Sequence, residues 1–86
     1  MFIILSYDVN VKRCQKCHRI CRKYLRPVHE SVFEGELTGS RVKALKAALA
    51  GVLDPDEDSV RIYELSSTRF ACVEMLGVTA VHSSIV

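Results

Sequence analysis

The sequence has no tryptophan, two prolines and four glycines among its 86 residues, and its longest uninterrupted apolar run covers only residues 1–5. A run this short cannot cross a bilayer, which requires about 20 apolar residues, so no membrane association is expected. The start of the chain also lacks the basic segment of a secretory signal, and Asp8 interrupts the apolar stretch. The sequence therefore predicts a cytoplasmic protein.

Net charge is also low, at +2, while 49% of the residues are hydrophobic, and this combination excludes a disordered chain. A chain of 86 residues supports a single hydrophobic core. Its apolar content is high for that size, so part of the apolar surface is expected to be covered by a second copy. We therefore expect a homodimer.

The four cysteines are not expected to form disulfides, because the cytoplasm keeps thiols reduced. Cys14 and Cys17, followed by His18, match the C-x-x-C-H pattern of haem attachment, and C-x-x-C also suits a soft metal ion. However, Cys14, Cys17 and Cys21 fall where a helix needs small apolar residues against a sheet, and free cysteine packs as such a residue. Core packing is the favoured interpretation, no haem is expected, and a soft-metal-binding C-x-x-C protein stays as an alternative.

Positive charge is concentrated near the amino terminus. Residues 12–26 contain seven basic residues and no acidic one. They are Lys12, Arg13, Lys16, Arg19, Arg22, Lys23 and Arg26. This run favours binding to nucleic acid. Because tryptophan is absent and the three tyrosines are far apart in sequence, we expect contacts with the phosphate backbone rather than base stacking.

Hydrophobic periodicity predicts alternating strands and helices. Strands are expected at residues 2–8, 28–37, 59–65, 70–76 and 78–86, and helices at residues 11–25 and from a cap at Thr38 or Ser40 through residue 53. The first helix should bury Val11, Cys14, Cys17, Cys21 and Leu25. Gly35 indicates a bulge or tight bend. The pattern predicts a two-layer sandwich with both helices on one face of the sheet.

Asp8 is the candidate catalytic and metal-binding residue. It follows the first strand, and α/β sheets place ligand sites at the carboxyl ends of strands. A turn or helix-capping role is the alternative. One carboxylate is a poor Mg²⁺ site, but a two-fold dimer could bring both copies of Asp8 together. The acidic residues 54–58 are interpreted as a solvated turn, because the glycine of a calcium loop is missing.

Three segments together resemble the CRISPR-associated protein 2 family. They are the first strand ending in Tyr7-Asp8-Val9, the run Ser31-Val32-Phe33-Glu34-Gly35-Glu36-Leu37, and Asp56-Glu57-Asp58-Ser59-Val60-Arg61-Ile62-Tyr63. Their order and spacing agree with the family across nearly the whole chain, including Leu76-Gly77-Val78 near its end.

The resemblance implies an α+β, ferredoxin-like sandwich with two helices on one face of a mainly antiparallel sheet. It implies a domain at residues 1–77 and a C-terminal edge strand at residues 78–86, which contributes to the dimer or to a partner contact. It also implies Mg²⁺-dependent (or Mn²⁺-dependent) endoribonuclease or DNase activity assigned to Asp8. In the family's central role, the dimer binds duplex DNA and bridges copies of the CRISPR-associated integrase (protein 1) during spacer integration; single-stranded RNA is a further expected ligand.

Two departures bear on these expectations. The loop after the aspartate is often acidic in the family, whereas here Asp8 is followed by Val9, Asn10 and Val11. Cysteines also replace aliphatic residues in the first helix, as the packing interpretation expects. A metal-dependent nuclease and a non-catalytic nucleic-acid-binding adaptor therefore both stay open.

Overall fold

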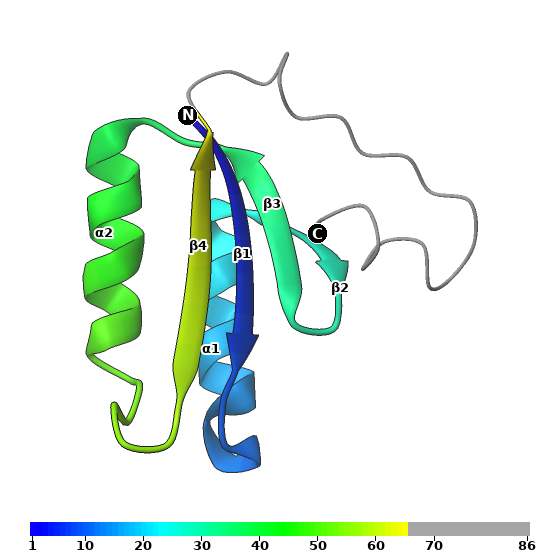
Figure 1. Cartoon of the computed structure of the whole chain (residues 1–86), viewed down its shortest axis with the longest axis vertical. Helices are drawn as coiled ribbons and strands as arrows, with labels where there is room; N and C mark the ends of the chain where they lie inside the picture. The colour runs from blue at the N-terminus through cyan, green and yellow to red at the C-terminus, as the bar shows by residue number, and fades with distance from the viewer. Residues whose placement is uncertain (66–86) are drawn as a thin grey trace.

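The computed structural model describes residues 1–65, in which four strands and two helices alternate along the chain. The elements are β1 (Phe2–Asp8), α1 (Val11–Tyr24), β2 (Arg26–His29), β3 (Val32–Glu36), α2 (Gly39–Ala50) and β4 (Ser59–Leu65). The strands form one sheet in the order β2-β3-β1-β4, and every pair of neighbours is antiparallel (Figure 1). This α+β arrangement is ferredoxin-like and confirms the predicted fold class.

Both helices pack against the same face of the sheet. On β1, Ile3 and Leu5 are fully buried and belong to one core cluster with Cys17 and Cys21 of α1 and Leu45 of α2. Because side chains alternate along a strand, Phe2, Ile4, Ser6 and Asp8 lie on the other face. We call this second face, which the helices do not cover, the open face of the sheet.

Residues 28–37, predicted as one extended segment, form a hairpin of two strands. The chain reverses at Glu30 and Ser31, where Ser31 O accepts a hydrogen bond of 3.0 Å from Tyr7 N. Gly35 lies in regular register opposite Ile3, so it does not form the predicted bulge; the irregularity falls on β2 between Pro27 and His29. A Cβ at Gly35 would come within 3.1 Å of Leu25 Cδ2, so close packing explains this glycine.

Two other predictions on the helices are wrong in detail. α2 ends at Ala50 rather than at residue 53, because Gly51 forms its C-cap and glycine is unfavourable within a helix. Leu53 still packs against the core from the following turn. Val11 does not join the buried stripe of α1: its side chain is 85% exposed.

Some predictions lie outside residues 1–65: the strands at 70–76 and 78–86 and the domain boundary after residue 77. Neither α1 nor α2, the two helices that the structure describes, is long and apolar enough to cross a membrane.

Candidate nucleic-acid interface

Asp8 is the last residue of β1, and its side chain is exposed on the open face. Its capping alternative is wrong, because Asn10 caps α1 through a hydrogen bond of 3.1 Å from Lys12 N to Asn10 Oδ1. Within residues 1–65, Asp8 forms no ion pair. Its carboxylate is therefore accessible to a ligand.

Arg61 is a basic neighbour of Asp8 that sequence reasoning missed. Asp8 pairs with Ser59 of β4 and Ser6 pairs with Arg61, so Arg61 is the diagonal neighbour of Asp8 on the open face. Diagonal neighbours lie about 7 Å apart, within reach of a long side chain. Because Arg61 lies far from the basic run in sequence, only the strand register shows that it is close to Asp8.

Arg13, one of the basic residues predicted to bind nucleic acid, is bound within the chain itself. Its Nε donates to Asp58 Oδ2 at 2.6 Å and its Nη2 to Asp58 Oδ1 at 3.1 Å, while Nη2 also pairs with Glu57. These hydrogen bonds raise the pKa of Arg13, with Asp58 contributing more than Glu57. Arg13 therefore ties the start of α1 to the loop before β4 instead of presenting a free cation.

Asp58 is the buried centre of this tie, and its side chain is 0% exposed. Besides Arg13, it accepts hydrogen bonds from Asn10 N (2.8 Å) and Asp54 N (2.9 Å). The bond from Arg13, followed by these backbone bonds, lowers the pKa of Asp58 below its usual range, against the opposing effect of desolvation. The predicted solvated turn thus holds for the exposed Asp56 but not for Asp58.

Five of the candidate basic residues form one exposed surface on α1, which we call the basic face: Lys12, Lys16, Arg19, Arg22 and Lys23. Arg26 follows at the start of β2, 72% exposed, with its Nη2 3.9 Å from Glu34 Oε2. Arg41 of α2, another residue that the sequence pattern did not indicate, lies over the ring of Tyr24 at 4.9 Å and extends the positive charge toward α2.

The structure does not bring all the candidate residues together. α1 packs on the face of the sheet opposite the open face, behind the strands in Figure 1. The basic face of α1 and the Asp8 carboxylate are therefore on different sides of β1. Lys12 is the nearest in sequence, in the first turn of α1. A phosphate backbone can therefore bind along α1 without touching Asp8.

The cysteines have different surroundings. Cys17 and Cys21 are fully buried in the core cluster, which confirms the packing interpretation for these two. A hydrogen bond with Cys17, together with burial, raises the pKa of Cys21, so this thiol stays protonated. Cys14 is half-buried and its Sγ lies 3.6 Å from Val9 O.

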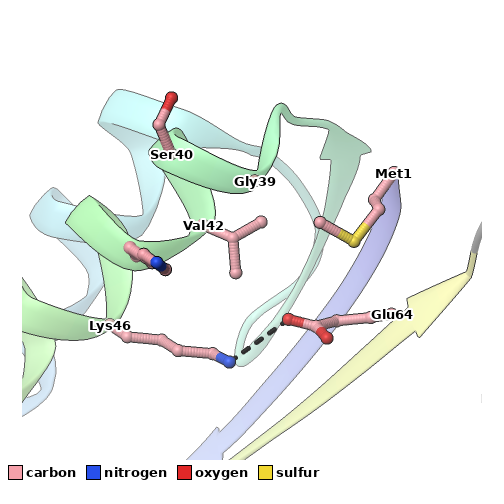
Figure 2. A pocket seen from close by; sticks show the side chains of 7 residues that line it. Met1, Gly39, Ser40, Val42, Lys46 and Glu64 are labelled. Atoms are coloured by element: carbon pink, nitrogen blue, oxygen red, sulfur yellow. Dashed lines mark ion pairs between the residues drawn. The ribbon is translucent and has the colours of Figure 1, made fainter.

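A hollow of about 540 Å³ lies at the other end of β1. Figure 2 shows it between the start of α2 and the strands, where Lys46 Nζ lies 3.2 Å from Glu64 Oε1. Met1 and Gly39 also line it. Because this hollow and Asp8 lie at opposite ends of β1, the hollow is not part of the candidate site.

Comparison with known proteins identifies the family. Residues 1–73 match the family described as CRISPR associated protein Cas2. The chain is 45% identical over 78 residues to the CRISPR-associated endoribonuclease Cas2 of Thermotoga maritima, covering 91% of this chain and 90% of that protein. It is 44% identical over 78 residues, with the same coverage, to the protein of that name from Frankia alni.

A solved structure agrees with this result. The crystal structure of Streptococcus pyogenes Cas2 matches with a TM-score of 0.78 and 32% identity, covering 90% of this chain and all (100%) of that one. Fold and sequence therefore lead to the same family. The chain belongs to the CRISPR-associated Cas2 family.

Proposed function

We propose that this protein is an endoribonuclease that works as a homodimer, with Asp8 as its catalytic residue. The position of Asp8 carries the proposal: an exposed carboxylate ends β1 on the open face, with Arg61 diagonal to it. Arg61 would bind the phosphate next to the bond that is cut, since guanidinium groups bind phosphate oxygens through paired hydrogen bonds. Relatives of this chain carry the name endoribonuclease, which supports the assignment.

Apolar residues on the open face support the dimer. Ile4 pairs with Tyr63 and Phe2 with Leu65, so these four side chains lie together on the face that the helices leave uncovered. Tyr63 is 41% exposed, and Ile4 and Leu65 are half-buried. Phe2 is already buried, at 8% exposed. A second copy packed on this face would bury Ile4, Tyr63 and Leu65 further and, with the two-fold axis near the end of β1, would bring the two Asp8 residues together.

A divalent metal ion at Asp8 would need ligand atoms from two copies of the chain. Within residues 1–65, no group of three or more His, Cys, Asp or Glu residues is placed to hold a metal ion. Two Asp8 carboxylates, with water and phosphate oxygens, would provide the oxygen ligands that Mg²⁺ or Mn²⁺ prefers. A metal held there would stabilise negative charge on the phosphate during cleavage.

Cleavage of single-stranded RNA by purified wild-type protein and by Asp8→Asn tests this proposal. With Mg²⁺ or Mn²⁺ present, we expect the wild type to cleave and Asp8→Asn, which keeps the shape but loses the charge, to be at least about 100-fold slower. Asp56→Asn, a change of another exposed aspartate, is the matched control and should cleave normally. Equal cleavage by wild type and Asp8→Asn would contradict the assignment.

A second function is favoured by the separation of the basic face from Asp8. We propose that the dimer also binds duplex DNA as a subunit of the spacer-integration complex and bridges copies of the CRISPR-associated integrase. Five exposed cations on one helix, with Arg41 beyond them, provide phosphate contacts that do not involve Asp8. In this role the protein is a non-catalytic adaptor.

Charge reversal on α1 tests the adaptor function. We expect Arg19→Glu with Arg22→Glu to abolish binding to duplex DNA and spacer integration, while Asp8→Asn leaves both intact. Lys43→Glu with Lys46→Glu on α2 makes the same change in net charge and should weaken binding much less. Affinity should fall steeply with salt; affinity that does not change with salt would contradict phosphate contacts.

A further inference from the structure

A hollow of about 370 Å³ lies between α1 and the turn that joins β2 to β3. Cys14, Gln15 and His18 line it from α1, Tyr7 from β1, and Glu30 and Ser31 from the turn. The hollow is on the helix side of the sheet, beside the amino-terminal half of the basic face. Neither proposed function uses it.

Two rings in its wall are held in place by a buried third ring. The centroid of Phe33, which is fully buried, lies 6.2 Å from that of Tyr7 in a stacked arrangement and 5.1 Å from that of His18 in an edge contact. The Tyr7 hydroxyl donates to Glu30 O at 3.2 Å and fixes the turn on the opposite wall. Burial raises the pKa of Tyr7 to about 12, so the hydroxyl remains a donor at neutral pH.

The lining combines flat apolar surface with polar groups at the edge. Tyr7 and His18 provide aromatic surface, while Gln15 and Ser31 provide an amide and a hydroxyl that can both donate and accept hydrogen bonds. A ligand that matches this lining is planar and aromatic, with donors and acceptors around its edge. A nucleobase has this chemistry.

The charges at the rim indicate how such a base would arrive. On α1, Gln15 is three residues after Lys12 and four before Arg19, and these spacings make both cations neighbours of Gln15 on the helix surface. Both are exposed. Glu30 on the opposite rim repels phosphate, so the backbone would follow α1 while the base points into the hollow.

We propose that this hollow binds an unpaired nucleobase of a nucleic acid whose backbone lies on the basic face of α1. The inference rests on the proposed nucleic-acid binding and adds a site that selects unpaired bases, since a base inside a duplex cannot enter. The sequence led us to expect contacts with the phosphate backbone rather than base stacking. The fold brings Tyr7 and His18, which are distant in sequence, into the lining of one hollow, and a base could stack there.

Binding of two single-stranded oligonucleotides with the same number of phosphates, one with normal bases and one abasic throughout, tests the site. Fluorescence anisotropy should show the wild type binding the normal strand about 10-fold tighter, as base stacking on aromatic side chains predicts. His18→Ala and Gln15→Ala should reduce this ratio and leave affinity for the abasic strand unchanged. His29→Ala, on β2 outside the hollow, should keep the wild-type ratio.

Gln15 is exposed, so Gln15→Ala gives a result even if His18→Ala does not fold. Equal wild-type affinity for the two strands would overturn the base site and leave the proposed function standing. An unchanged ratio in both hollow variants would overturn it as well. If the wild type bound neither strand, the base site and the proposed nucleic-acid function would both be wrong.

Discussion

The residues next to Asp8 on the open face determine which chemistry its carboxylate can support. The register places Ser59 opposite Asp8 and Arg61 diagonal to it. In the proposed site, the guanidinium of Arg61 would bind the phosphate oxygens, whereas the Asp8 carboxylate, which repels phosphate, would hold the divalent metal ion. Arg61 should therefore matter for cleavage and little for binding along α1.

Replacing Arg61 with glutamine tests this role. We expect Arg61→Gln to slow RNA cleavage about 10- to 100-fold, the range given by the loss of one charge-assisted hydrogen bond. Affinity for duplex DNA should change little, because the basic face is intact. Lys43→Gln, which removes an exposed cation on α2, is the control. An equal loss of cleavage in both variants would mean that Arg61 acts only through the net charge of the protein.

Asp58 has a structural role, and pH reveals it. Its pKa in the folded protein lies below the usual range, mainly because of Arg13. A carboxylate with a lowered folded pKa stabilises the fold fully above its unfolded pKa of about 3.9 and loses this effect as pH falls toward the folded value. The wild type should therefore lose stability progressively below a pH of about 5.

Thermal unfolding of wild type and Asp58→Asn between neutral and acidic pH measures this effect. At neutral pH the variant should melt several degrees lower, because an amide loses the ion pair and turns a donor toward Asn10 N or Asp54 N. The difference in Tm between the two proteins should shrink as pH falls. Asp56→Asn should match the wild type throughout; a constant difference in Tm for Asp58→Asn would contradict a stabilising role of the ionised Asp58 carboxylate.

At the scale of elements, periodicity predicted both helices, and only the carboxyl end of α2 differs by more than one residue, at Ala50 rather than residue 53. The stripe of Cys17, Cys21 and Leu25 is buried as expected, because helical spacing alone puts these residues on one side. Val11 fits the same spacing but is exposed. Helical spacing places Val11 on a side of α1 and does not tell how far the sheet extends beneath it.

One substitution in the core and one on the surface compare a buried with an exposed helical position. Leu45 of α2 is fully buried, so Leu45→Ala should lower the free energy of unfolding by about 2–5 kcal/mol. Val11→Ala should change it by less than about 0.5 kcal/mol, because the side chain is already in solvent. Chemical denaturation measures both; a large loss for Val11→Ala would mean that a partner or another segment covers that side chain.

The candidate site was predictable only in part, for reasons of distance along the chain. Asp8 and the cations of α1 are readable because each belongs to a local pattern, the end of a strand or one face of a helix. Arg13 pairs with Asp58 in the loop before β4, and Arg61 of β4 lies beside Asp8 of β1. In each case the two residues are more than 40 positions apart in sequence. Such pairings are set by sheet register and loop packing, which a single sequence does not contain.

For the molecule as a whole, the two faces of the sheet are occupied differently. The helices cover one face, and the other carries Ile4, Tyr63 and Leu65 with Asp8 at its end. A dimer across the open face would leave both basic faces outside, free for nucleic acid, and would bring the two Asp8 residues together at its edge, where RNA can reach them. We therefore expect one cleavage site to need Asp8 from both copies.

Mixing wild type with Asp8→Asn shows whether one cleavage site uses both carboxylates. After subunit exchange at equal amounts, a site that needs both carboxylates is complete in only about one quarter of the dimers, whereas independent sites would leave about half of the activity. We therefore predict that RNA cleavage falls with the square of the wild-type fraction. A linear decrease, with exchange verified by mass spectrometry, would contradict a shared site.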